Sequence, residues 1–140
     1  VSMIGNLAKK IFGSANDREV TAAISAHCRD YPGCFDLAGR TRLAEAVDLL
    51  SLAAAVVTND SGLMHIAAAL GRPLVVVYGA TSPAFTPPLN DNAAVLVSEL
   101  DCAPCFQREC PLGHHRCMQE IPSRRVVAEL DRLLAGGGEG

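Results

Sequence analysis

The chain has 140 residues, of which 49% are hydrophobic and 19% are charged, and its formal net charge is −3. This composition predicts a single soluble globular domain, with an ordered core over about residues 11–134, and excludes a disordered chain. The acidic balance and the absence of tryptophan argue against a nucleic-acid partner. No apolar run reaches the roughly 18 residues that span a bilayer, and no segment resembles a secretory signal, so we expect a cytoplasmic protein.

Strand-like and helix-like segments alternate along the chain, which is typical of an α/β domain with a parallel sheet. In the first third we expect the end of a strand at residues 11–13, a helix over residues 17–28 and a short strand at residues 34–37. The spacing of the apolar residues in that helix predicts a buried face made of Val20, Ile24 and Cys28.

The next segment combines a turn with a second helix. Residues 39–41 form the turn, and Thr41 is a candidate cap for the helix that follows. A strand over residues 54–58 comes after this helix. The side chains expected on the inner face of the helix are Leu43, Ala46, Val47 and Leu50.

The second half of the chain contains an unbroken apolar run at residues 74–78, which predicts a central parallel strand that is covered on both faces. A short strand at residues 94–97 and an irregular, cysteine-rich stretch over residues 101–118 follow. A last helix over residues 123–134 is amphipathic, and residues 136–140 form a glycine-rich tail that we expect to be frayed. The side chains expected on the inner face of this helix are Val126, Val127, Leu130, Leu133 and Leu134.

The most informative segment runs from Val56 to His65, where a short apolar run ends in a polar turn and a helix of small residues follows. The first backbone N–H groups of a helix have no internal partner, and the helix dipole adds partial positive charge there. A phosphate or diphosphate is therefore the expected occupant. His65 follows Ser61 by four residues, which places its imidazole on the face of the helix beside the turn.

Each residue of this turn has a second interpretation. Asp60 and Ser61 are also good helix caps, and Gly62 would permit close packing. A histidine on an apolar helix is often a core residue whose ring bonds a carbonyl group. Because His65 lies within one turn of an anion site, we favour a functional role, in which an adjacent phosphate keeps the imidazole protonated. Asp17 is either an ordinary acid in the first turn of its helix or an acceptor for ribose hydroxyls.

Ligands of an open parallel sheet bind beyond the carboxyl ends of its strands. Four loops rich in Gly, Ser, Thr, Asn and Asp leave such ends in this sequence, and they include Gly13 and Gly79. Each loop offers backbone or hydroxyl contacts, so we expect the four to converge on one polar ligand. They cover residues 13–17, 39–41, 59–65 and 79–82.

A second cluster of chemically capable residues lies in the stretch 101–118, where four cysteines accompany His114 and His115. The spacing is suggestive of a structural zinc site, whose candidate ligands are Cys102, Cys105, Cys110 and Cys117. Free thiols, disulfides and an iron–sulfur cluster are the alternatives, although the spacing matches neither common ferredoxin pattern. An aliphatic-rich domain of this size needs no disulfides. No pattern ties this stretch to the turn after Asn59, so we do not expect a catalytic metal.

Taken together, these segments resemble glycosyltransferase family 9, the ADP-heptose:lipopolysaccharide heptosyltransferases. The sequence Asp-Ser-Gly-Leu-Met-His at residues 60–65, followed by an alanine-rich helix and Gly-Arg-Pro, is the most specific part of the resemblance. The cysteine-rich stretch resembles that of a subgroup of the family. The matching segments are residues 12–17, 37–41, 58–65, 79–83, 86–88 and 102–117.

The resemblance implies a fold and an activity. The fold is a Rossmann-like parallel sheet flanked by helices, the C-terminal, donor-binding domain of a two-domain GT-B glycosyltransferase. The donor is ADP-L-glycero-D-manno-heptose, and the reaction is the inverting transfer of heptose to the inner core of lipopolysaccharide. The resemblance places this reaction at the cytoplasmic face of the inner membrane, with the full-length protein peripheral to that membrane, and it requires no cofactor.

The resemblance also assigns residues to the donor. Asp17 falls where the family places an acid on the ribose, and Thr41 falls where the family contacts the adenine. Asp60, Ser61, Gly62 and His65 match the motif that holds the diphosphate. The remaining candidates for contact with the donor are Leu63, Gly13 and Gly79.

The family keeps its general base and its acceptor contacts in an N-terminal domain, which these 140 residues do not include. We therefore expect no catalytic residue in this chain, and we expect it to bind ADP or ADP-heptose without turnover. Two alternatives stay open at this point. The chain could be a stand-alone nucleotide-binding module, or a small zinc-stabilised interaction domain built around the cysteines.

Overall fold

The computed structural model describes residues 15–27 and 33–136, with side chains from residue 21 onward. The chain divides into two compact units, Val1–Leu49 and Leu50–Gly140, and each is described by itself. The predictions for the strand at residues 11–13 and for Gly13 lie outside the described residues, as do those for Cys28 and for residues 137–140 of the tail. No helix in the described part of the chain is both long enough and apolar enough to cross a membrane.

The first unit contains the helix α2 (Ala15–His27) and the beginning of α3 (Leu43–Leu52), which ends in the second unit. The position predicted for the first helix is confirmed within two residues at its start. Its predicted buried face is wrong at Ile24, whose side chain is 56% exposed. No strand forms among the described residues of this unit, so the helix has no sheet there to pack against.

The strand predicted at residues 34–37 is wrong, because this segment is a loop that leads into a turn. The Asp36 carboxylate accepts a hydrogen bond from the Ala38 amide at 2.9 Å, and the Arg40 amide closes the turn onto the Leu37 carbonyl at 3.0 Å. Gly39 has a φ of 69°, a left-handed conformation that glycine adopts at little cost. The predicted turn is therefore confirmed.

The cap of α3 falls one residue later than predicted, on Arg42 instead of Thr41. The Arg42 amide donates to the Glu45 carboxylate at 2.7 Å, which is one half of a capping box. The two side chains also form an ion pair at 2.8 Å. The hydrogen bonds from the Arg42 side chain, and then the one from its amide, lower the pKa of the Glu45 carboxyl.

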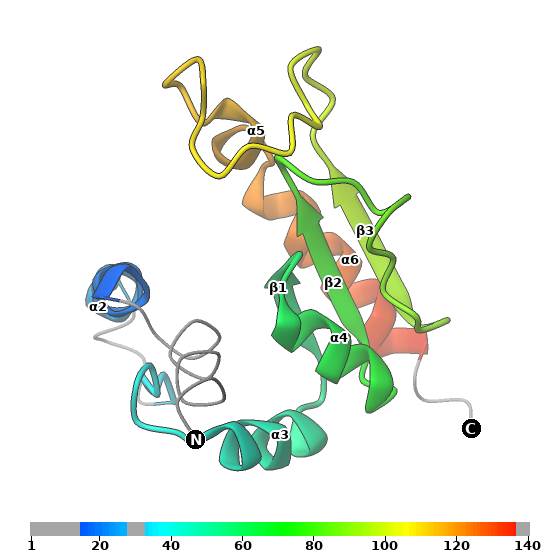
Figure 1. The fold of residues 1–140 in the computed structure, drawn as a ribbon. Coiled ribbons are helices and arrows are strands. Elements are labelled where there is room, and N and C mark those ends of the chain that lie inside the picture. Colours follow the sequence, from blue (N-terminus) through cyan, green and yellow to red (C-terminus); the bar gives the residue numbers. More distant parts are fainter. Residues whose placement is uncertain (1–14, 28–32, 137–140) are drawn as a thin grey trace, which may run out of the picture. The chain divides into compact units, whose positions relative to one another are not determined.

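The second unit contains a parallel sheet of three strands in the order β1 (Val56–Asn59), β2 (Leu74–Tyr78) and β3 (Ala93–Val97) (Figure 1). Val56 pairs with Leu74, and Leu74 pairs with Ala93. The predicted central strand is confirmed with its bounds, while the first strand begins two residues later than predicted. The sheet and its helices confirm the predicted α/β class.

One helix covers each face of this sheet (Figure 1). Helix α4 (Gly62–Ala69) packs on one face, where alternate side chains of β2 meet it, and α6 (Ser123–Gly136) packs on the other. The buried residues under α4 are Met64, Ala67, Ala68, Leu74, Val76 and Tyr78. Those on the α6 side are Val75, Ala94, Leu96 and Leu133.

Helix α6 buries a narrower stripe than the sequence predicts. Val126 and Leu130 pack against the core, and Leu133 is 4% exposed. Val127 and Leu134 are 53% and 45% exposed, so their predicted inward placement is wrong. A sheet of three strands is narrow, so it covers only the line of α6 side chains formed by Val126, Leu130 and Leu133. Val127 and Leu134 lie beside that line.

The cysteine-rich stretch is irregular, as predicted, until its end, where the short helix α5 (Arg116–Gln119) forms. This helix lies against the end of β2. A Cβ atom on Gly79 would overlap the Met118 side chain and would lie 3.4 Å from the Cys117 sulfur. The absence of a side chain at Gly79 therefore allows the cysteine-rich stretch to approach the sheet.

Candidate functional site

The carboxyl ends of β1 and β2 lie side by side, because the two strands are parallel neighbours. The turn after β1 leads into α4, and the loop after β2 begins at Gly79. This is the edge of the sheet at which open α/β folds bind ligands. Six predicted site residues gather there in the second unit, namely Asp60, Ser61, Gly62, Leu63, His65 and Gly79.

The start of α4 presents backbone N–H groups to which no described residue is bonded. Ser61 is the cap residue, with φ −155° and ψ 168°, and its side chain makes no capping hydrogen bond. The Met64 amide donates to the Ser61 carbonyl at 3.1 Å. No acceptor for the amides of Gly62 and Leu63 lies among the residues that the structure describes. These two groups are therefore available to an anion.

The hydroxyl of Ser61 extends this group of donors. The Thr58 hydroxyl donates to the Asn59 carbonyl at 3.0 Å and lies 3.4 Å from the Ser61 oxygen. Helix capping by the Ser61 side chain, which the sequence left open, is therefore not what the structure shows.

His65 is exposed one turn into α4. Its alternative interpretation as a core histidine is wrong, because the ring is not buried. No hydrogen-bond partner of the ring lies within the described ranges, so the imidazole is open to a ligand.

The Asp60 carboxylate is bonded by Thr86, which Tyr78 in turn holds, and no sequence pattern connects either residue with Asp60. The Thr86 hydroxyl donates to the Asp60 carboxylate at 2.9 Å, and the fully buried Tyr78 donates its hydroxyl to the Thr86 carbonyl at 2.6 Å. Burial, and then the charge of Asp60, raise the pKa of Tyr78, so its hydroxyl stays a donor. Thr86 lies 26 residues from Asp60 along the chain, and no spacing pattern links the two.

The cysteine-rich stretch reaches this site, so the expectation that nothing ties the two together is wrong. The Phe106 amide donates to the Ala80 carbonyl at 2.7 Å. The rings of Phe106 and Phe85 meet edge to face, with their centres 5.4 Å apart. A cavity of about 300 Å³ is lined by Asp60, Thr81, Phe85, Thr86 and Phe106. One wall of the site at the end of the sheet is thus made by the cysteine-rich stretch.

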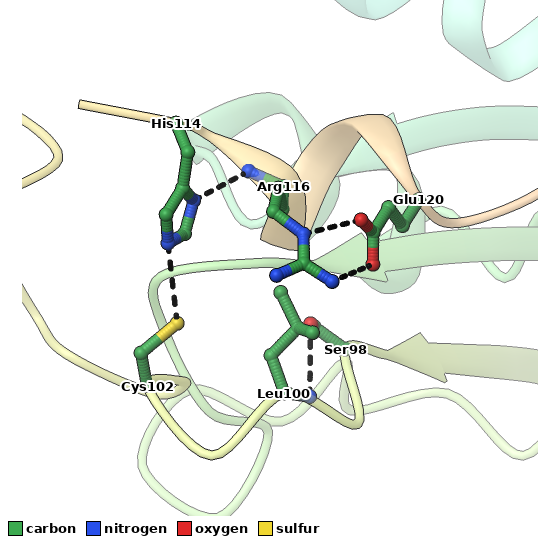
Figure 2. Close-up of polar contacts among 6 residues, drawn as sticks. All are labelled: Ser98, Leu100, Cys102, His114, Arg116 and Glu120. Atoms are coloured by element: carbon green, nitrogen blue, oxygen red, sulfur yellow. Dashed lines mark hydrogen bonds and ion pairs between the residues drawn. The ribbon is translucent and has the colours of Figure 1, made fainter. Parts of the chain in front are cut away.

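The cysteines and histidines of that stretch line a separate cavity of about 180 Å³. The Cys102 sulfur lies 4.0 Å from Nε2 of His114, while Nδ1 of the same ring accepts the Arg116 amide at 3.1 Å (Figure 2). Because Nδ1 acts as an acceptor, the ring proton lies on Nε2 and faces the sulfur. An ion pair with Glu120 holds the Arg116 side chain (Figure 2).

The Cys110 thiol is surrounded by backbone donors. Hydrogen bonds from the amide of His115, and from those of Leu112, His114 and Gly113, lower its pKa against the opposing effect of burial. Cys102, Cys105, Cys110 and Cys117 form no disulfide. No three His, Cys, Asp or Glu side chains in the described ranges are arranged to hold a metal ion. The zinc site stays a prediction, which metal analysis of the purified chain would test.

Two further predicted site residues belong to the first unit. Asp17 lies in α2, and its side chain is outside the described residues. Thr41 is half-buried before the start of α3. Their contacts with an adenosine group stay predictions.

Comparison with known proteins supplies a second line of evidence. Residues 6–116 match the family described as glycosyltransferase family 9 (heptosyltransferase). The chain is 43% identical over 130 residues to lipooligosaccharide heptosyltransferase 2 of Haemophilus influenzae, an alignment that covers 89% of this chain and 37% of that protein. It is 44% identical over 126 residues to lipopolysaccharide heptosyltransferase 2 of Escherichia coli, with 89% and 36% covered.

Solved structures agree with these relatives. The structure of E. coli ADP-heptose lps heptosyltransferase II matches with a TM-score of 0.74 at 44% identity, over 90% of this chain and 36% of that one. The glycosyl transferase family 9 protein from Veillonella parvula matches with a TM-score of 0.57 at 25% identity, over 70% and 28%. The chain therefore spans about 37% of the length of the relatives that it matches. The predicted resemblance, most closely to the heptosyltransferase II group, is confirmed.

Proposed function

Because the chain belongs to glycosyltransferase family 9, the heptosyltransferases, we propose that these residues bind the nucleotide-sugar donor of a glycosyl transfer. The proposed donor is ADP-heptose, with its diphosphate at the start of α4. The observation that carries this proposal is the pair of amides at Gly62 and Leu63, which have no acceptor among the described residues. Ser61 and His65 lie beside these amides and add a hydroxyl and an imidazole.

The chemistry of the transfer explains why such donors are useful. An acceptor hydroxyl attacks the anomeric carbon, the bond from that carbon to the phosphate oxygen breaks, and its electrons move onto the diphosphate. N–H groups that are fixed in place before the reaction stabilise this charge as it develops. An exposed helix end contributes only about 0.3–1 kcal/mol to such an interaction. The transfer therefore also needs a base that removes the proton of the acceptor hydroxyl.

We propose that this base and the acceptor site belong to another domain, as the resemblance implies. The acceptor would be the inner core of lipopolysaccharide, at the cytoplasmic face of the inner membrane. On this proposal the 140 residues alone bind the donor and do not transfer heptose. Measurable transfer by the isolated chain would contradict it.

Family membership favours donor binding over the two alternatives. A stand-alone nucleotide-binding module would use the same amides. It would differ from a transferase only in having no domain that binds the acceptor. An interaction domain held together by zinc would not need a nucleotide at all.

Titration calorimetry with ADP and with adenosine tests the role of the amides. If the start of α4 holds the diphosphate, ADP should bind and adenosine should bind at least about tenfold more weakly, because it lacks the anion. Equal affinity for ADP and adenosine would contradict the binding of the diphosphate at the start of α4. No binding of ADP at all would overturn the proposed function.

A further inference from the structure

The cavity beside Asp60 combines one carboxylate with two aromatic rings. Its lining comes from three separate segments, namely the turn before α4, the loop after β2 and the cysteine-rich stretch. Asp60 is adjacent to Ser61 at the start of α4, so a group attached to a diphosphate bound there would lie next to this cavity. The cavity has a volume of about 300 Å³, which is sufficient for a single sugar ring.

The two rings present unusually large apolar surfaces. Phe85 is 76% exposed and Phe106 is 52% exposed. The face of an aromatic ring is electron-rich, and one side of a pyranose ring presents polarised C–H groups. Exposed aromatic rings therefore suit a sugar, whose hydroxyls need other partners.

The polar part of the cavity supplies those partners. One oxygen of the Asp60 carboxylate accepts the Thr86 hydroxyl, and no bond to its other oxygen is found among the described residues. No described residue bonds the Thr81 hydroxyl either. A carboxylate with a free oxygen accepts hydrogen bonds from hydroxyl groups well, because a charged acceptor forms the stronger hydrogen bond.

The backbone at Phe106 is held in an unfavourable conformation. Its φ is +55°, a left-handed value that is uncommon for a bulky residue, and its amide is bonded to Ala80. Strain of this kind persists where the surrounding structure imposes it and is concentrated at functional sites. Here the hydrogen bond to Ala80 ties Phe106 to the loop after β2, and Cys117 and Met118 of the same stretch lie close to Gly79.

We propose that Phe85 and Phe106 form the wall on which the glycosyl ring of the donor lies, with Asp60 and Thr81 bonding its hydroxyls. This inference rests on the proposed function, since the diphosphate at α4 positions the sugar. It gives the cysteine-rich stretch a role, which is to carry Phe106 to the donor. Phe85 and Phe106 are then specificity-determining residues for the sugar and not for the nucleotide.

The test compares ADP with ADP-heptose by calorimetry on the intact chain and on variants. The intact chain should bind ADP-heptose more tightly than ADP. In Phe106→Ala and Phe85→Ala, the affinity for ADP-heptose should fall about five- to tenfold, while the affinity for ADP should change by less than about twofold. Phe106→Leu keeps an apolar side chain without a ring. This variant should remain folded and should lose part of the preference for ADP-heptose over ADP.

Leu112→Ala and Leu89→Ala are the matched controls. Leu112 lies in the same stretch as Phe106 and is 62% exposed, and Leu89 lies in the same loop as Phe85 and is 81% exposed. Neither lines the cavity, so both variants should keep the preference for ADP-heptose. Unchanged affinity for ADP-heptose in the phenylalanine variants, or an equal loss for both ligands, would overturn this inference and leave the proposed function standing. An intact chain that binds neither ligand overturns both.

Discussion

The turn after β1 and the cysteine-rich stretch use similar chemical groups in opposite ways. Both offer backbone amides and a histidine near the carboxyl end of β2. In the turn, the amides of Gly62 and Leu63 have no acceptor among the described residues. In the stretch, successive amides point at the Cys110 sulfur, and the His114 ring lies between an amide and the Cys102 sulfur. The amides of the turn are available to a ligand, whereas those of the stretch bond the Cys110 sulfur.

This difference shows that the number of chemically capable side chains does not identify a binding site. The stretch has four cysteines and two histidines, yet no three of them are arranged to hold a metal ion in the described part of the chain. The turn has fewer such residues, and two of its amides have no acceptor in the part of the chain that the structure describes. The two regions are connected all the same, because the stretch contributes Phe106 to the cavity beside Asp60.

The largest effect should follow from breaking the contact that joins the two regions. In Gly79→Ala, the new Cβ would lie 2.9 Å from Cγ of Met118, which must move. We expect the free energy of unfolding to fall by about 1–3 kcal/mol in urea denaturation, as in other overpacked sites. Adding Met118→Ala to the same chain removes the side chain that the new Cβ overlaps, so it should recover most of the lost free energy of unfolding. A double variant as unstable as Gly79→Ala would show that this contact is not the cause.

A smaller loss should follow from releasing Asp60. Thr86→Val keeps the shape of the side chain and removes the hydroxyl that donates to the carboxylate. The free energy of unfolding should fall by about 1 kcal/mol, the typical contribution of one hydrogen bond. Thr86→Ser keeps the hydroxyl, so its free energy of unfolding should fall by less than that of Thr86→Val. If the serine and valine variants are equally unstable, the methyl group and not the hydrogen bond stabilises this loop.

The histidines of the two regions allow a direct comparison. His65→Ala should weaken ADP binding about two- to fivefold, which is the roughly 0.3–1 kcal/mol expected of an exposed charge interaction. His115→Asn alters the exposed histidine at the other region, where φ is 51°, and asparagine tolerates that conformation. This second variant should bind ADP as the intact chain does. Unchanged binding in His65→Ala would leave His65 without a role in binding the nucleotide.

The smallest change concerns reactivity and not stability. Because the converging amides lower the pKa of the Cys110 thiol, its thiolate persists at lower pH than an ordinary thiolate, which forms near pH ~8.5. Mass spectrometry after iodoacetamide treatment across a pH series should therefore show Cys110 alkylated at lower pH in the folded chain than in urea. Cys110→Ser identifies the labelled peptide. Identical pH profiles in the folded and unfolded chain would contradict the arrangement of amides.

Local patterns were sufficient for much of the second unit. The run Leu74–Tyr78 predicted the central strand, and the change from apolar to small and polar residues after Asn59 predicted the turn and the helix α4. The same local reasoning was wrong at residues 34–37, because a strand needs a neighbour to pair with. It also placed Val127 and Leu134 on the inner face of α6, because helical periodicity does not reveal how wide the facing sheet is.

The sequence by itself determined the family, the central strand and the turn that leads into α4, because these depend on residues close together along the chain. Only the tertiary structure decided that Tyr78 and Thr86 hold Asp60, that His65 is exposed, and that Phe106 reaches the cavity. The contacts of Asp60 and of Phe106 join segments that parallel pairing of the strands brings to one edge. Their spacing in the sequence carries no periodic signal, so folding has to bring them together before they can be recognised.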